Sequence, residues 1–244
     1  AKWVVLVEPD LEYSAQDRGP RPDQGRTSVE RNIEDMYKFN GQPFSSLLYA
    51  QLLKIAGVDE VMTVHNHSYS TQMVFKEIFG DHFTNLLPNK LYARYILETG
   101  IVEPDRLVLC APDKGALSFV EKTKEALGLK NVPIVVMDKQ RSGERKVSTQ
   151  ISPNSPYPLE IIQGRDVIVL DDMVRTGNTI VECCTALREQ NPNKVIFMVT
   201  HFHSSSEGRE NLASNAVDEI ITTNTIPEIL NRDLQGRLRK KIAV

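Results

Sequence analysis

The segment Val-Ile-Val-Leu-Asp-Asp-Met-Val-Arg-Thr-Gly-Asn-Thr-Ile, residues 167–180, combines the residue types of a phosphate and sugar site. Its first four apolar residues predict a buried strand, and Asp171 and Asp172 follow at the carboxyl end of that strand. Residues 176–179 predict a helix start, where backbone N–H groups, hydroxyls and the helix dipole favour a phosphate. The carboxylates suit sugar hydroxyls or a metal ion. The alternative is that both aspartates only cap a helix, but the complete pattern favours a binding site.

A second group of charged residues directly follows the apolar run of residues 134–137. It contains Lys139, Arg141, Arg145 and Lys146. Cations on a closing loop can neutralise the charge that develops on phosphate oxygens during a transfer reaction. A solvated charge run is the commoner meaning of such a cluster. Its position after a predicted strand favours the transfer site.

Short apolar runs alternate with amphipathic stretches of helical length along the chain. Each apolar run predicts a strand buried on both faces; the runs are residues 3–7, 61–64, 107–111, 134–137, 167–170 and 195–200. Helices are predicted in between, including residues 45–56, 116–127 and 179–189. This order predicts an α/β fold with mainly parallel sheets flanked by helices.

Two polar stretches interrupt this alternation. Residues 18–40 are rich in charged residues, Gly and Pro, and predict an exposed loop. Residues 140–157 predict a long loop that leaves the carboxyl end of a strand. Open parallel sheets place active sites and lids at that end, so the second stretch is a candidate active-site loop.

Composition limits the possible classes of protein. A chain of 244 residues with 41% hydrophobic and 25% charged residues predicts a folded protein of two domains. A net charge of -3 gives no general basic field, so we expect no nucleic-acid partner. No apolar run is long enough for a membrane span, so we expect no membrane partner. Cys110, Cys183 and Cys184 form no metal-binding pair and predict buried thiols in the cytoplasm.

The loop of residues 171–180 resembles the ribose 5-phosphate loop of the phosphoribosyltransferase superfamily. Five more segments resemble, in order, segments of ribose-phosphate diphosphokinases, also called phosphoribosyl pyrophosphate (PRPP) synthetases: residues 13–18, 61–68, 111–115, 137–141 and 223–227. The resemblance covers almost the whole chain. It implies an enzyme of nucleotide biosynthesis that transfers the diphosphate of ATP to the C1 hydroxyl of ribose 5-phosphate, giving PRPP and AMP, with magnesium as cofactor.

The resemblance also implies roles for individual residues. Lys139 and Arg141 match the catalytic Lys-x-Arg pair. The implied ribose 5-phosphate residues are Asp171, Asp172, Arg175, Thr176, Gly177, Asn178 and Thr179. The implied ATP residues are Gln16, Asp17, Arg18 and His67. His67 and Asp113 match positions that are associated with the metal ion.

The sequence departs from the family pattern at several of these positions. Ala15 stands where an arginine normally contacts the nucleotide, and His65 stands where the family usually has an aspartate. The stretch of residues 18–40 is longer than the usual loop and is interpreted as an insertion. Arg18 or another residue of this insertion is a candidate replacement for the missing guanidinium.

The resemblance predicts two phosphoribosyltransferase-type domains. Residues 1–92 form the nucleotide side, and residues 93–244 form the ribose 5-phosphate side. Ala1 aligns with the interior of the family pattern, so we expect the first domain to be incomplete. Because the family places its nucleotide site between domains and subunits, we expect a homo-oligomer.

Two other functions remain possible at this point. A phosphoribosyltransferase that consumes PRPP would explain the phosphate loop, but it would not explain Gln16, His67 and the pair Lys139 and Arg141. A catalytically impaired regulatory homologue of PRPP synthetase would explain Ala15 and would not need the catalytic pair.

Overall fold

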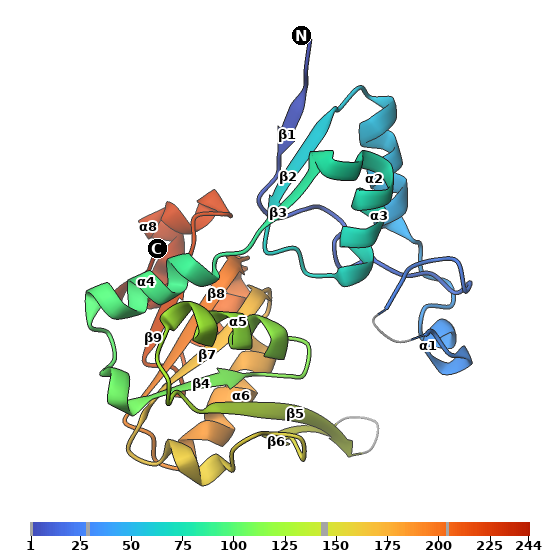
Figure 1. The fold of residues 1–244 in the computed structure, drawn as a ribbon. Coiled ribbons are helices and arrows are strands. Elements are labelled where there is room, and N and C mark those ends of the chain that lie inside the picture. Colours follow the sequence, from blue (N-terminus) through green and yellow to red (C-terminus); the bar gives the residue numbers. More distant parts are fainter. Residues whose placement is uncertain (1, 28–29, 143–145, 204) are drawn as a thin grey trace. The chain divides into compact units, whose positions relative to one another are not determined.

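The computed structural model describes residues 2–27, 30–142, 146–203 and 205–244. The side chains of residues 139–148 also lie outside the described structure. The chain separates into two compact units, Ala1–Leu87 and Pro88–Val244 (Figure 1). The boundary proposed after residue 92 falls inside the first helix of the second unit, Asn89–Thr99.

The first unit is a parallel three-stranded sheet with two packed helices. The sheet has the order β1-β2-β3, as Figure 1 shows. Residues that alternate along the strands face a small core that also contains Phe75 and Phe79. The elements are β1 (Val5–Val7), α1 (Ile33–Lys38), α2 (Ser45–Ile55), β2 (Glu60–Val64), α3 (Tyr69–Phe79) and β3 (Phe83–Leu86).

One expectation for the first unit was wrong. The first strand is not buried on both faces: Leu6 packs against the core, whereas Val5 and Val7 are 44% and 65% exposed. The described residues of this unit cover only one face of the sheet, so alternate residues of an apolar run face outward. The described part of residues 18–40 is mainly loop, and in addition it contains α1 and ion pairs of Arg18 and Arg31 with Asp35.

The second unit contains a seven-stranded sheet with helices on both faces. Its strand order is β10-β9-β8-β7-β4-β5-β6, and all pairs are parallel except β5 with β6. The strands are β4 (Leu107–Ala111), β5 (Ile134–Ser142), β6 (Lys146–Ile151), β7 (Asp166–Val174), β8 (Lys194–Phe202), β9 (Glu219–Thr222) and β10 (Ile242–Ala243). The helices are α4 (Asn89–Thr99), α5 (Leu117–Leu127), α6 (Asn178–Arg188), α7 (Ser206–Leu212) and α8 (Arg232–Gln235).

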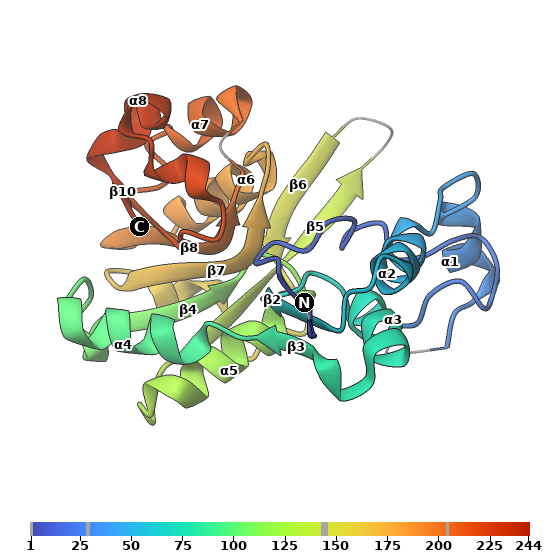
Figure 2. The same cartoon turned by 90° about the horizontal axis from the view of Figure 1, so that it is seen from above.

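Two apolar cores lie on the two faces of this sheet. Figure 2 shows α4 and α5 on one face and α6 and α7 on the other. All five residues of β4 are buried, as are the first five of β7, which agrees with near-continuous apolar strands in a covered parallel sheet. The predicted α/β class with mainly parallel sheets is confirmed. Cys110, Cys183 and Cys184 are buried and free, as predicted. No helix among the described residues is both long and apolar enough to cross a membrane.

The prediction of a long loop over residues 140–157 was wrong. Residues 137–142 pair with residues 146–151 as an antiparallel hairpin of β5 and β6. Because β6 is the edge strand of the sheet, it needs no continuous apolar run, and its polar sequence therefore resembles a loop.

Candidate functional site

The strand order of the second unit brings several candidate residues to one edge of the sheet. The chain passes from β4 to β5 on one side of β4, and later returns as β7 on the other side. Ligands of open α/β sheets bind outside the carboxyl ends of strands at such a reversal of order. Cys110 of β4 pairs with Val169 of β7. Asp113 comes three residues after Cys110 and Asp171 two residues after Val169, so both lie at this edge of the sheet.

The two carboxylates of β7 are partly buried and lie against their own backbone. Asp171 Oδ1 accepts a hydrogen bond from the Asp172 N–H at 3.0 Å, and Asp172 Oδ1 accepts one from the Met173 N–H at 2.7 Å. The pKa of Asp171 is raised well above its usual value by burial and by the charges of Asp172 and Asp113. The charged form of Asp171 is therefore disfavoured in the protein alone, and hydroxyl donors or a cation at this edge would stabilise it.

The predicted phosphate loop has the geometry of an open helix start. Gly177 adopts a left-handed conformation with φ of 74° and precedes α6, with no described side chain capping the helix. The first N–H groups of a helix have no acceptor within the helix, so they are directed toward a ligand position. A Cβ atom on Gly177 would lie 3.0 Å from Leu212 Cγ, so both conformation and packing require glycine.

Both ends of α7 support this loop from outside, through its N-cap residue Ser205 and through Asn211 in its last turn, and the sequence analysis missed this. Ser205 Oγ donates to the Arg175 carbonyl at 2.8 Å. Asn211 Nδ2 donates to the Thr176 carbonyl at 2.8 Å and to Asn178 Oδ1 at 2.7 Å. Ser205 is a residue type that commonly caps a helix, and it follows the predicted strand of residues 195–200, so it could have indicated that a helix starts here. No sequence signal identifies the contacts of this helix with the phosphate loop.

Asp113 forms a tight turn after β4. Its Oδ1 accepts hydrogen bonds from the N–H groups of Gly115 at 2.8 Å and Ala116 at 3.2 Å. Lys114 Nζ lies 2.9 Å from Asp138 Oδ2, which links this turn to β5 immediately before Lys139. The role of Asp113 at a metal ion stays a prediction.

Lys139 and Arg141 lie in the hairpin of β5 and β6. Lys139 pairs with Thr149, and Arg141 pairs with Val147. Their backbone positions lie in the carboxyl-terminal half of β5, beyond the residues that pair with β4, toward the same edge of the sheet as the carboxylates of β7. Their side chains lie outside the described structure, so their catalytic role stays a prediction.

The residues predicted to contact ATP lie in the first unit. Asp17 is buried and accepts a hydrogen bond from Ser68 Oγ, the residue after His67, so these two segments meet. Arg18 contacts Asp17 at 3.3 Å and Asp35 at 3.1 Å, and its guanidinium lies 4.5 Å from the centre of a phenylalanine ring. Gln16 and His67 are exposed. The structure thus places Arg18 in an internal network.

The described residues contain no group of three or more His, Cys, Asp or Glu side chains arranged to hold a metal ion. His67 lies in the first unit and Asp113 in the second. The structure leaves the predicted metal roles of both residues untested.

Known proteins resemble the chain in both sequence and structure. Residues 89–230 match the family described as phosphoribosyl transferase domain. A ribose-phosphate pyrophosphokinase of Mycobacterium leprae is 32% identical over 230 residues, covering 93% of this chain and 60% of that protein. A ribose-phosphate pyrophosphokinase 1 of Streptococcus agalactiae is 30% identical over 226 residues, covering 93% of this chain and 61% of that protein. The chain thus spans about three fifths of these relatives.

A solved structure supports the same relationship. The crystal structure of phosphoribosylpyrophosphate synthetase from Mycobacterium smegmatis aligns with a TM-score of 0.69 and 30% identity, covering 93% of this chain and 63% of that one. The predicted resemblance to ribose-phosphate diphosphokinases is therefore confirmed. The match over residues 89–230 places the phosphate loop and both carboxylates of β7 inside the shared domain, and the chain belongs to the phosphoribosyl transferase domain family.

Proposed function

We propose that the protein is a ribose-phosphate diphosphokinase, which transfers the diphosphate of ATP to the C1 hydroxyl of ribose 5-phosphate. One observation favours this activity over that of a phosphoribosyltransferase, which would also bind a phosphorylated ribose. The Lys-x-Arg segment of β5 and the acidic phosphate loop of β7 occupy one edge of one sheet, on either side of β4. Both the relatives and the solved neighbour are named for this activity.

The second unit would hold ribose 5-phosphate. Its phosphate would accept hydrogen bonds from the N–H groups and hydroxyls of residues 176–179 at the start of α6, and Arg175 would add a positive charge. Asp171 and Asp172 would accept hydrogen bonds from sugar hydroxyls. The phosphate of the ligand would thus meet hydrogen-bond donors, and its sugar hydroxyls would meet hydrogen-bond acceptors.

The transfer needs positive charge beside the diphosphate. The C1 oxygen forms a bond to the β-phosphorus of ATP while the bond from that phosphorus to the oxygen of the α-phosphate breaks. The C1 hydroxyl loses its proton, and AMP leaves. Lys139 and Arg141 would neutralise the charge on the transferring oxygens, and charge stabilisation of this kind supplies most of the catalysis of phosphoryl transfer.

Magnesium fits the acidic edge of the second unit. The ion is commonly held by one or two carboxylates together with substrate phosphates and water, and Asp171 and Asp172 offer such a pair. When bound, it would supply charge neutralisation for the phosphate chain. Asp113 has a second oxygen, Oδ2, that neither turn hydrogen bond uses, and His67 would act on the nucleotide side.

The nucleotide side of the proposal rests on the first unit. Gln16, Asp17, Arg18 and His67 would contact ATP, and the contact between Asp17 and Ser68 supports their grouping. We also propose a homo-oligomer and a cytoplasmic location. The buried free cysteines support a reducing compartment.

Product formation without any added base tests the proposal. Purified protein is incubated with ATP, magnesium and ribose 5-phosphate, and the products are followed by phosphorus NMR. AMP and PRPP are expected together. Lys139→Ala is expected to abolish both while ribose 5-phosphate still binds, because the phosphate loop is intact.

Each alternative function predicts a different result of this experiment. A phosphoribosyltransferase would leave ATP intact and would convert added PRPP only with a base. A regulatory homologue would bind ribose 5-phosphate without any turnover. Either result would overturn the diphosphokinase proposal.

A further inference from the structure

Three buried hydroxyl groups at the start of α3 hold the segment of residues 14–17. Ser68 Oγ donates a hydrogen bond to Asp17 Oδ2, and Ser70 Oγ donates one to the Asp17 carbonyl at 2.7 Å. Thr71 Oγ1 donates at 3.0 Å to the carbonyl that begins the segment. All three residues are buried. Loss of such a donor leaves a buried acceptor without its partner, so each contact holds the segment in place.

Ser70 differs from the other two because its hydroxyl also joins the insertion. Ser70 Oγ accepts a hydrogen bond from the Arg26 N–H at 2.9 Å while it donates to the Asp17 carbonyl. A serine hydroxyl has one proton to donate, and a backbone N–H can only donate, so the directions of both bonds are fixed. One buried side chain therefore links the insertion to the segment that is predicted to contact ATP.

The insertion also approaches this carbonyl group directly, at Gly25. Gly25 has a φ of 103°, which residues with a side chain rarely adopt. A Cβ atom at this position would lie 2.6 Å from the Asp17 carbonyl oxygen and 3.0 Å from Ser70 Oγ. Glycine is therefore required here for the insertion to reach Ser70.

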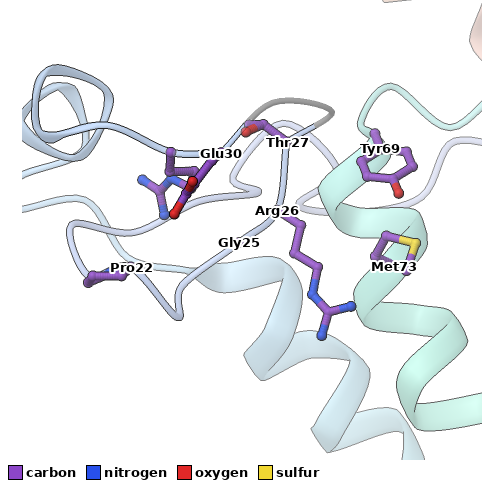
Figure 3. A pocket seen from close by; sticks show the side chains of 8 residues that line it. Pro22, Gly25, Arg26, Thr27, Glu30, Tyr69 and Met73 are labelled. Atoms are coloured by element: carbon purple, nitrogen blue, oxygen red, sulfur yellow. The ribbon is translucent and has the colours of Figure 1, made fainter.

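The outer contact between the insertion and α3 is open. Arg26 of the insertion and Tyr69 and Met73 of α3 line a pocket of about 300 Å³, shown in Figure 3. The Arg26 guanidinium contacts Glu77 at 3.4 Å, but the two side chains are 61% and 69% exposed. Exposed ion pairs contribute little to stability. The contacts at Ser70 and Gly25 are thus the buried part of this attachment.

Buried charges hold the insertion itself together. Arg31 is 5% exposed, contacts Asp35 at 2.7 Å and donates to the carbonyls of Gln24 at 2.6 Å and Gly19 at 2.8 Å. Arg18 contacts the other oxygen of Asp35 at 3.1 Å. An insertion ordered in this way can support a neighbouring segment, because moving it would disturb several contacts at once.

We propose that Ser70 is a positioning residue for the nucleotide side. Its hydroxyl passes the support of the insertion to the Asp17 carbonyl and so holds Gln16 and Asp17 in the orientation that contacts ATP. This inference rests on the proposed function, in which these two residues contact ATP. It assigns no ligand contact to Ser70, which is buried, and it gives the insertion a supporting role.

Calorimetric titration with ATP and magnesium tests the inference in Ser70→Ala. The variant should bind ATP about fivefold or more weakly, because a buried hydrogen bond to the Asp17 segment is lost. Ser46→Ala is the matched control and should bind ATP like the wild type. Ser46 is likewise the second residue of a helix and fully buried, but its hydroxyl has no hydrogen-bond partner among the described residues.

Gly25→Ala disturbs the same support and leaves Ser70 in place. The added Cβ atom would push the insertion away from the Asp17 carbonyl, so ATP binding should again weaken about fivefold or more. Gly41→Ala is its control, because Gly41 has a φ of 76° but its Cβ atom would meet no atom within 4 Å. Equal ATP affinities of these two variants would exclude the insertion as the source of support.

Steady-state kinetics and titration with ribose 5-phosphate distinguish positioning from a general loss of stability. In Ser70→Ala, KM for ATP should rise, whereas kcat and the affinity for ribose 5-phosphate should stay within about twofold of wild type. A parallel loss of ribose 5-phosphate affinity would indicate general destabilisation and overturn the inference.

The same measurements separate this inference from the proposed function. Equal ATP affinities of Ser70→Ala and Ser46→Ala overturn the inference while the proposed activity stands. If ATP binding depends on Ser70 but the wild type forms no PRPP, the inference stands and the proposed activity fails. Absence of ATP binding by the wild type overturns the inference.

Discussion

Asp171 lies in a place where a negative charge is unfavourable. Burial raises its pKa, and the neighbouring charges of Asp172 and Asp113 raise it further. A protein can retain such a group where a ligand compensates for it, and functional sites are where strongly shifted groups gather. A polar site at this position was predictable from the sequence, because two aspartates follow the apolar run of residues 167–170. The interaction with Asp113 was not, because it depends on the neighbouring positions of β4 and β7.

Asp171→Asn should therefore raise stability and weaken substrate binding. The folded state holds the Asp171 proton to higher pH than the unfolded state, so ionisation lowers wild-type stability as pH rises past about 3.9. The stability gain of the variant should be present at pH 7 and disappear below the ordinary aspartate pKa. Urea denaturation at several pH values measures it. Loss of a charged hydrogen bond to the sugar should weaken ribose 5-phosphate binding about tenfold. A pH-independent difference in stability would contradict this account.

Gly177→Ala tests the start of α6. A left-handed conformation costs a non-glycine residue roughly 1–2 kcal/mol, and overpacking against Leu212 adds about 1–3 kcal/mol. Gly164→Ala is the matched control, because Gly164 has a φ of 67° but its Cβ atom would meet no atom within 4 Å. Thermal unfolding should show the larger loss for Gly177→Ala, and only this variant should weaken ribose 5-phosphate binding. Equal losses in both variants would refute the packing role.

At the scale of elements, the buried strands were predictable and the supporting elements were not. The run of residues 107–111 coincides with β4, because a parallel strand covered on both faces is apolar throughout. The hairpin of β5 and β6 was missed, since an edge strand carries no such run. Helix α7 was also missed, although it holds the phosphate loop through Ser205 and Asn211.

Asn211→Ala tests whether α7 holds the loop for binding. The variant loses hydrogen bonds to the Thr176 carbonyl and to Asn178, each worth about 1 kcal/mol. Ribose 5-phosphate affinity should fall about fivefold or more. Asn231→Ala is the control, because Asn231 caps α8 by accepting from the Asp233 N–H at 3.0 Å. It should cost about 1 kcal/mol of stability without changing affinity. Comparable affinities of both variants would exclude a positioning role for Asn211.

At the scale of the whole molecule, the sequence indicated two units of different character. The second unit buries both faces of its sheet, whereas the described part of the first unit covers one. The exposed apolar residues Val5, Val7 and Leu86 of its strands have no cover within that unit. Parallel sheets are normally covered on both faces, so this face is the candidate contact surface of the proposed homo-oligomer. Sequence patterns predicted the strands but could not show which face lacks a cover.

In the proposed homo-oligomer, Val7→Lys should weaken self-association. Val7 is 65% exposed on a sheet face, and a lysine there would place charge in an apolar contact. Light scattering over a range of protein concentrations should show a smaller mass for the variant than for wild type. Ile33→Lys is the control, because Ile33 is 67% exposed on α1 and away from the sheet. An unchanged mass for Val7→Lys would exclude this face as the oligomer interface.

The destination of the β-phosphorus of ATP tests the proposed activity most directly. The protein is incubated with magnesium, ribose 5-phosphate and ATP labelled at the β-phosphorus, and the products are separated by chromatography. We expect the label in PRPP in amounts equal to the AMP formed, and no labelled PRPP with Lys139→Ala. Label that stays in ATP, or that appears only in ADP or free pyrophosphate, would contradict diphosphate transfer to the sugar by this chain.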